Sequence, residues 1–481
     1  MWQVGLCVVA VVTILICQWL YKWRNPKCNG VLPPGSMGLP FIGETFQLLI
    51  PNHSLDLHPF IKKRIEKYGK VFSTNLVGRP IVITADPKLN NYLIQQEGRE
   101  VELWYLDTFQ KVFGLEGEAR PNAVGQIHKY VRGSYLNFFG VDRLRTKLLP
   151  EIETTVRINM HRWSTQGTID AKKETANMVA IFAAKTLFGH DFEKSSDDIG
   201  TTIAGFVEGL LSFPLNIPGR PCLGKKVIWA KLKERIACPE EKKGDFLDQA
   251  VKDLNTDFLT ENFVVSVIVG ALFATVESIS TSITLSFKLF EDHPWVVEDL
   301  VAEHDIILKN KEDKKSPLTW EEYKSMTVTM HRRGEERRRG GSRGSSIVAA
   351  GPLLLSPIAA PPPRSSQLGP ASVADRRASA PGSLVLLLLL PSPLVYATSC
   401  WAIMIVNSTL QLNPGVFKDP LTFNPKRWED IDPQIASKNF MPFGGGTRQC
   451  AGAELAKSFF AIFLHVLVSE YRCVSHLFHI S

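Results

Sequence analysis

The stretch that decides the fold is PFGGGTRQCAG, residues 442–452, a glycine-rich turn with a single cysteine ahead of an apolar helical run. Three consecutive glycines allow backbone angles and close approaches that side chains would block. A phosphate-binding loop would need Lys-Ser/Thr after the glycines, and none follows here. A buried structural cysteine is the simpler alternative. The full spacing Phe443-x-x-Gly446-x-Arg448-x-Cys450-x-Gly452 is more informative than one thiol, and it favours a functional cysteine.

The composition is that of a globular chain of 481 residues, with 44% hydrophobic and 21% charged residues. Its eight cysteines include no CxxC pair, which disfavours disulfides and zinc and suits a reducing compartment. The net charge of +7 comes mostly from residues 331–395, which hold nine Arg, no Lys and three acidic residues. The rest of the chain is therefore near neutral and shows no basic groove with interleaved aromatics. Nucleic-acid binding is not expected.

An apolar run of seventeen residues, Val4 to Leu20, lies at the lower limit for a membrane span. Interfacial aromatic residues and then basic residues close this run: Trp19, Tyr21, Trp23, Lys22, Arg24 and Lys27. Positive charge after the span predicts that the body of the protein lies in the cytosol. A cleaved signal peptide is the alternative, but the run lacks a charged n-region and a small-x-small cleavage site. Residues 1–24 are thus expected to form a membrane anchor, and residues 25–44 a proline-rich connector.

The remaining chain predicts a mostly α-helical fold with a minor β-sheet. In Lys70–Pro87, runs of β-branched and aromatic residues flank Gly78-Arg79-Pro80, and this pattern indicates a hairpin. Helical periodicity dominates from Pro87 to Pro294, with a proline-rich loop at Ser212–Pro221. Residues 331–399 differ in kind: they have no hydrophobic period, are rich in Arg, Pro, Gly, Ala and Ser, and indicate a disordered low-complexity insertion.

One long helix is predicted from about Glu261 to Phe290, with Thr260 as its N-cap. Glu277 is the only charged residue between Asn262 and Phe287. A second membrane span is the alternative interpretation, and the central carboxylate argues against it. Because a carboxylate in an apolar helix is costly to bury, Glu277 is a candidate functional residue.

The cysteine turn resembles the haem-binding signature of the cytochrome P450 superfamily, the haem-thiolate monooxygenases. The resemblance implies a single large P450-fold domain behind the anchor, made of residues 45–330 and 400–481. It also implies that Cys450 is the axial ligand of the haem iron. The cofactor-binding residues implied in the same turn are Phe443, Gly446, Arg448 and Gly452, with Arg448 paired to a haem propionate.

Three further stretches fit the same family. FNPKRW, residues 423–428, resembles its P-x-R-W element, with Pro425 and Arg427 at the matching positions. GQIHKYVR, residues 125–132, places His128 and Arg132 on one helix face, where the family holds haem propionates; a solvated face is the alternative. FATVESIS, residues 273–280, resembles the oxygen-activation element, which implies that Glu277 and Ser278 supply protons as the catalytic pair.

The chain also departs from the family pattern. In the oxygen-activation element, Thr275 replaces the usual Gly and Ser278 the usual Thr. The E-x-x-R helix that should pair with Arg427 is missing, since Glu335-x-x-Arg338 and Glu336-x-x-Arg339 have no apolar face to dock them. Arg427 is therefore expected to lose its partner. The C-terminus is expected to be truncated. The missing E-x-x-R helix, whose place the insertion takes, and the truncated C-terminus together suggest an aberrant gene model.

The residues of these motifs are most similar to those of plant steroid and terpenoid hydroxylases, above all the enzymes of brassinosteroid biosynthesis. The resemblance implies hydroxylation of a sterol side chain with O2, a haem cofactor, and electrons from NADPH through a separate cytochrome P450 reductase. It also implies contact with membrane lipid and a single-pass location in the endoplasmic reticulum membrane. An abscisate or triterpenoid hydroxylase is the alternative within the class. A catalytically inactive product that interacts through its Arg/Pro-rich segment is the alternative outside it.

Overall fold

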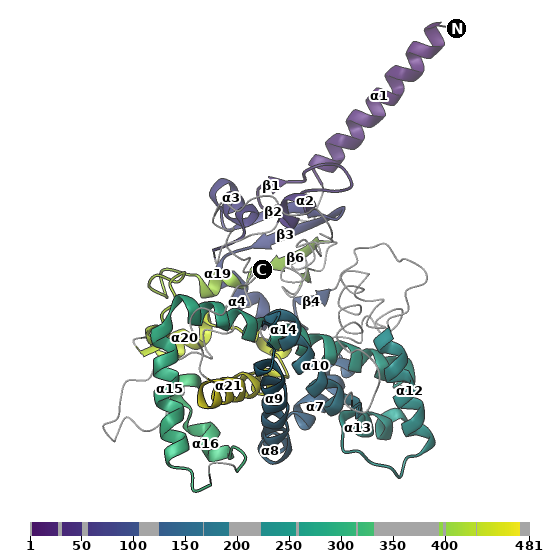
Figure 1. Cartoon of the computed structure of the whole chain (residues 1–481). Helices are drawn as coiled ribbons and strands as arrows, with labels where there is room; N and C mark the ends of the chain where they lie inside the picture. The colour runs from purple at the N-terminus through teal and green to yellow at the C-terminus, as the bar shows by residue number, and fades with distance from the viewer. Residues whose placement is uncertain are drawn as a thin grey trace, which may run out of the picture.

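The computed structural model describes residues 2–26, 31–50, 56–104, 125–166, 168–191, 223–255, 259–313, 316–330, 394–397, 401–429 and 431–471. Within these residues the chain is mostly helical with one six-stranded mixed sheet, which confirms the predicted fold class (Figure 1). The proline loop at 212–221, the two E-x-x-R matches and the expected truncation after residue 472 lie outside the described residues.

The sheet has the strand order β1-β2-β3-β6-β5-β4 and joins distant parts of the chain. Its strands are β1 (Gly35–Ser36), β2 (Val71–Leu76), β3 (Arg79–Thr84), β4 (Val101–Trp104), β5 (Leu394–Ala397) and β6 (Trp401–Ile405). The predicted hairpin is confirmed as antiparallel β2 and β3, with Val71 opposite Thr84. Strand β3 then pairs in parallel with β6, and Ile81 lies opposite Ala402.

Two strands were not predicted. Strand β4 lies in a segment expected to be helical, and β5 lies in the expected insertion of residues 331–399. The two pair with each other in antiparallel register, and β5 also pairs with β6. Residues 394–397 of the expected insertion therefore belong to the sheet.

The main helices are α1 (Trp2–Arg24), α2 (Thr45–Leu49), α3 (Pro59–Tyr68), α4 (Pro87–Gln95), α7 (Gln126–Phe138), α9 (Leu149–Ser164), α10 (Ala171–Phe188), α12 (Leu223–Ala237), α13 (Phe246–Lys252), α14 (Glu261–Asp292), α15 (Pro294–Lys309), α16 (Trp320–Ser325), α20 (Pro433–Asn439) and α21 (Ala453–Glu470). Short elements are α8 (Val141–Arg143), α17 (Thr327–Met330), α19 (Ser408–Gln411), the π-turn η1 (Leu144–Leu148) and the 3-10 turns η3 (Asp253–Asn255), η6 (Pro425–Glu429) and η7 (Gly446–Arg448).

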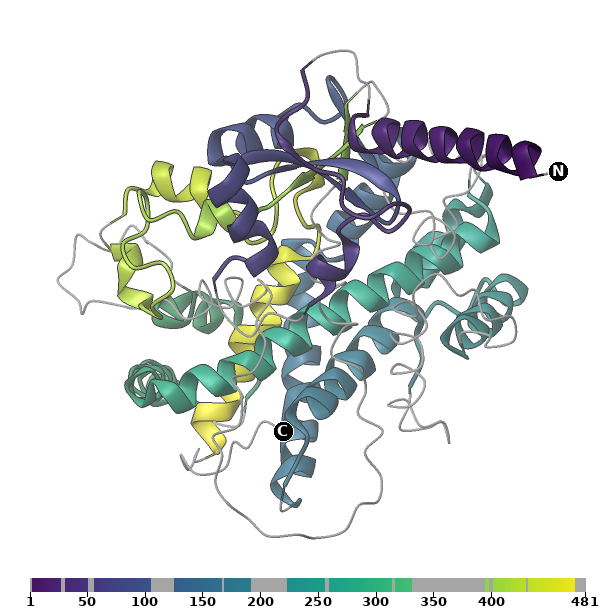
Figure 2. The same cartoon turned by 90° about the horizontal axis from the view of Figure 1, so that it is seen from above.

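The large hydrophobic core is built on α9, α10, α14 and α21. Helix α21 buries an almost unbroken run from Leu455 to Val466, as expected for a helix at the centre of a domain. In Figure 2 the yellow α21 crosses α14, and residues of both helices belong to the same core cluster. Because α21 begins directly after the cysteine turn, this core fixes where the turn lies.

Two described helices are long and apolar enough to cross a membrane, Gly5–Arg24 and Glu261–Asp292. Such helices are weak evidence by themselves, but their burial differs. None of the first window is buried, and Figure 1 shows α1 projecting away from the β-rich end of the molecule. In α14, 61% of the window is buried, so this helix is a core helix. Its predicted N-cap is confirmed, because the Thr260 hydroxyl accepts a hydrogen bond from the Phe263 N–H.

Candidate active site

The cysteine turn is closed by its own backbone. The N–H of Cys450 donates to the carbonyl of Phe443 at 2.8 Å, and the N–H of Gly444 donates to that of Met441 at 3.0 Å. Gly446 has a φ of +63°, and a Cβ there would lie 2.5 Å from the carbonyl oxygen of Ile94 at the end of α4. Only glycine combines this left-handed conformation with so close a backbone neighbour. The turn is therefore shaped by contact with α4.

Cys450 lies just before the N-terminus of α21. Gly452 is the N-cap residue, and its carbonyl accepts from the N–H of Ala456 at 2.9 Å. Cys450 is exposed by surface area, yet the surrounding protein excludes enough water to raise the pKa of its thiol. A backbone hydrogen bond from Gly452 and the charge of Arg132 partly oppose this effect. The thiol is thus accessible and protonated, and a metal ion bound to it would displace the proton.

Helix α7 brings the predicted His128 and Arg132 to the same turn. A guanidinium N–H of Arg132 donates to the carbonyl of Gln449, next to the cysteine. Burial lowers the pKa of His128 to about 4, with further lowering by Arg448 and Arg132 and a partial offset from Glu97. His128 is therefore a neutral imidazole at neutral pH, and the positive charges of Arg132 and Arg448 both disfavour its protonation. The structure brings together the predicted residues of α7 and the turn.

Glu97 is a site residue that the sequence reasoning missed. It lies in the turn after α4, where its carboxylate pairs with Arg448 Nε and accepts from Thr447 Oγ1 at 2.8 Å. No local pattern marks it, because its partners lie about 350 residues further along the chain. It stands in the polar run Gln95–Glu100, which in sequence is typical of an ordinary helix end.

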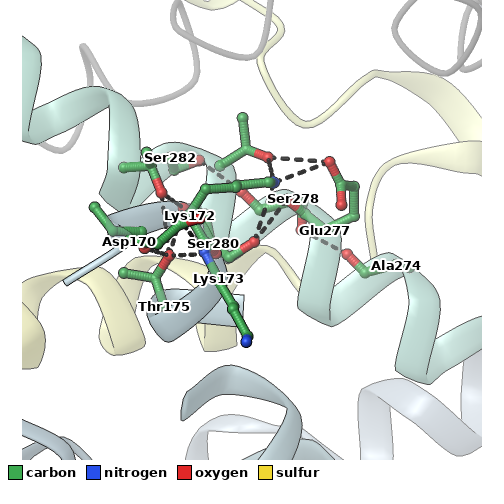
Figure 3. A network of polar contacts seen from close by, with 12 residues as sticks. Asp170, Lys172, Lys173, Thr175, Ala274, Glu277, Ser278, Ser280 and Ser282 are labelled. Atoms are coloured by element: carbon green, nitrogen blue, oxygen red, sulfur yellow. Dashed lines mark hydrogen bonds and ion pairs between the residues drawn. The ribbon is translucent and has the colours of Figure 1, made fainter. Parts of the chain in front are cut away.

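Glu277 is not isolated, contrary to the expectation from its own helix. Its Oε1 lies 3.0 Å from Lys172 Nζ of α10 and accepts from Thr281 Oγ1 at 3.2 Å (Figure 3). Lys172 Nζ also donates to Thr281 Oγ1 at 2.5 Å. The next residue, Ser278, instead donates to the carbonyl of Ala274 at 2.6 Å. The predicted acid and alcohol are thus adjacent in sequence but have different partners.

Arg427 does not stand unpaired. It is half-buried, and its guanidinium donates to the carbonyls of Asp419 at 3.0 Å, Asn424 at 3.3 Å and Thr422. Both E-x-x-R matches lie outside the described residues, so the loss of that partner stays a prediction. Among the described residues, carbonyls of the preceding loop satisfy the guanidinium. A neutral carbonyl offers less compensation than a carboxylate, so this arrangement is weaker than an ion pair.

Helix α17 is capped by a carboxylate from α15. The carboxylate of Glu303 in α15 accepts from the N–H groups of Val328 at 2.6 Å and Thr329 at 3.0 Å, and from the Thr329 hydroxyl. The carboxylate therefore caps the helix that begins at Thr327. The described part of this helix ends at Met330.

The donor set around the turn fits a haem. An accessible thiol suits the iron, and Arg132 and Arg448 are suited to the two carboxylates of the porphyrin. The close contact of Gly446 with Ile94 keeps the turn flat where a side chain would intrude. Among the described residues, no cluster of three or more His, Cys, Asp or Glu residues could hold a metal ion.

Comparison with known proteins agrees with this fit. The family model described as "Cytochrome P450" matches residues 401–476. The chain is 60% identical over 480 residues to a beta-amyrin 16-alpha-hydroxylase of Maesa lanceolata, covering 98% of this chain and 94% of that protein. It is 43% identical to a cucurbitadienol 11-hydroxylase of Siraitia grosvenorii, again over 98% of this chain and 94% of the relative. A solved retinoic-acid-bound cyanobacterial P450, CYP120A1, has the same fold, with a TM-score of 0.63, 20% identity and 91% coverage of both chains.

The fold and these relatives define a haem-thiolate monooxygenase. The chain belongs to the cytochrome P450 family, which uses haem and receives electrons from NADPH through a reductase. The expected kinship with brassinosteroid hydroxylases needs correction. A cholesterol 22-monohydroxylase of Paris polyphylla is only 30% identical, whereas the triterpenoid hydroxylases are at 60% and 43%.

Proposed function

We propose that this protein hydroxylates a triterpenoid, with beta-amyrin as the first substrate to test. The observation that carries the proposal is the 60% identity to a beta-amyrin 16-alpha-hydroxylase over 98% of the chain. A second relative that hydroxylates a triterpenoid, cucurbitadienol, supports the same substrate class. Triterpenoid hydroxylation, which the sequence analysis gave as an alternative, thus replaces sterol hydroxylation as the proposed activity.

In this proposal the residues of the cysteine turn hold the cofactor. Cys450 provides the thiolate ligand, and the amide dipoles at the start of α21 favour its negative charge. Arg132, Arg448 and the neutral His128 bind the propionate groups, while Phe443 packs beside the sulfur. Gly446 and Gly452 keep the turn compact. The haem, when bound, supplies the activation of O2 that amino-acid side chains cannot perform.

Proton supply is assigned to Glu277 and Ser278. The carboxylate of Glu277 is held by Lys172 of α10 and Thr281 of α14, so its Oε1 has a fixed position between the two helices. The hydroxyl of Ser278 can rotate from the Ala274 carbonyl to pass a proton onward.

The location follows from α1. This exposed apolar helix is proposed to anchor the protein in the endoplasmic reticulum membrane, with Lys22 and Arg24 on the cytosolic side. A membrane-bound NADPH-cytochrome P450 reductase would then share the same surface. A lipid-dissolved triterpenoid would reach the enzyme from the bilayer.

The test is turnover in microsomes that contain this chain and a plant reductase. Beta-amyrin, cucurbitadienol and cholesterol are supplied separately with NADPH, and products are identified by mass spectrometry. The proposal predicts a product of one added oxygen from a triterpenoid, and none in the Cys450→Ser variant. Hydroxylation of cholesterol alone, or product formation by Cys450→Ser, would overturn it.

A further inference from the structure

The carboxylate of Glu97 bridges two neighbouring residues of the cysteine turn. One oxygen pairs with Arg448 Nε and the other accepts from Thr447 Oγ1 at 2.8 Å. Glu97 is 12% exposed and Arg448 20% exposed at this contact. Arg448 and Thr447 stand two and three residues before Cys450. If either side chain lost its bond to Glu97, the position of the Cys450 thiol would therefore change.

The backbone of the same segment supports the contact. The carbonyl of Ile94 lies against Gly446, and the Ile94 side chain lies 3.2 Å from where a Cβ of Gly445 would be. The end of α4 is therefore packed directly onto the turn, and Glu97 follows its last residue, Gln95, by two positions. Packing sets the distance between the two segments, while the carboxylate adds directional bonds.

The charge balance gives Glu97 a second role. Arg132 of α7 donates to the carbonyl of Gln449 in the turn, and Arg448 belongs to the turn itself, so two positive charges meet there. Two guanidinium groups repel each other, and the carboxylate of Glu97, paired with Arg448, offsets part of this repulsion before any anionic ligand arrives.

We propose that Glu97 is a positioning residue: it fastens the cysteine turn to α4 and fixes the direction of the Arg448 guanidinium for haem binding. This inference rests on the proposed haem site and deepens it. A simple ion pair of little consequence is the competing explanation, since exposed pairs contribute almost nothing. The low exposure and the second bond from Thr447 argue for the positioning role.

The test compares Glu97→Gln with Glu100→Gln in the full-length protein. Glu100 is a matched carboxylate three residues on that accepts from the Tyr92 hydroxyl at 2.7 Å, away from the cysteine turn. The first readout is hydrogen exchange of the amides of residues 444–450, which does not require haem. The second is the rate at which the purified protein loses haem to excess apomyoglobin.

The proposal predicts about tenfold faster exchange and about tenfold faster haem loss in Glu97→Gln. Glu100→Gln should remain within about twofold of wild type, and Glu97→Asp should recover part of the effect. If Glu97→Gln does not fold, Thr447→Val replaces it, because that change removes the second bond without leaving a buried charge. Equal rates of amide exchange and haem loss in Glu97→Gln and Glu100→Gln would overturn the proposal. If Thr447→Val has to be used, equal rates in that variant and wild type would overturn it. Wild type without haem would instead contradict the proposed function, and the exchange measurement would still decide the role of Glu97.

Discussion

Replacement of Gly446 by Ala should loosen the cysteine turn. The backbone at this position has a φ of +63°, and a residue with a side chain adopts it at a cost of about 1–2 kcal/mol. The added Cβ would also lie 2.5 Å from the carbonyl oxygen of Ile94. A carbonyl at the end of a packed helix cannot move aside as a flexible side chain can, so the turn itself must shift.

The expected magnitude follows from these two effects. Overpacking of a tight site typically adds about 1–3 kcal/mol, so the total for Gly446→Ala is at least about 2 kcal/mol. If the turn binds haem, this free energy is lost from haem binding and corresponds to about thirtyfold weaker affinity. The assay is haem retention, measured as the haem-to-protein ratio during dilution and heating.

Gly133→Ala is the matched control. Gly133 lies in α7, and a Cβ there would meet nothing within 4 Å. Because Ala is a better helix former than Gly by about 1 kcal/mol, this change should leave haem retention unchanged or improve it slightly. Equal haem retention in Gly446→Ala and Gly133→Ala would refute the conclusion that the turn needs glycine.

Two further predictions concern polar pairs that join neighbouring helices. Lys172→Met should lower hydroxylation several-fold and increase NADPH consumption without product, because Glu277 loses its partner; Lys173→Met, whose side chain points away from this network in Figure 3, should not. His304 and His465 share a hydrogen bond of 2.9 Å in the core, and burial lowers their pKa values to about 3 and about 4. The unfolded chain therefore binds more protons below about pH 6.5, so stability should be full above that pH and fall as the pH drops toward 4, by an amount on the order of 2 kcal/mol. Thermal unfolding against pH should be flatter in His465→Gln and unchanged in the exposed His161→Gln; a wild-type profile in His465→Gln would contradict this account.

The elements that the sequence predicted correctly have local signals. The β2–β3 hairpin follows from alternating β-branched residues, and α14 follows from the Thr260 cap and a long apolar period. Strands β4 and β5 have only four residues each, and their pairing joins segments about 290 residues apart. Their formation depends on the assembled sheet, so no window of sequence could indicate them.

The same reasoning separates the site residues. Cys450, Arg448 and Gly446 could be proposed from the sequence because one turn carries a dense pattern. Lys172 and Glu97 were missed because their partners lie 105 and 351 residues away along the chain. The substrate class was also beyond the motifs, since the turn that binds the cofactor carries no information about what is oxidised.

The reduced carbon-monoxide difference spectrum tests the central claim most directly. Thiolate-ligated haem predicts a band at about 450 nm in the wild-type protein. The Cys450→Ser variant should lose this band, whereas Cys238→Ser, at another exposed cysteine, should keep it. A wild-type protein without the band, or a Cys450→Ser variant that retains it, would contradict the assignment of Cys450 as the ligand.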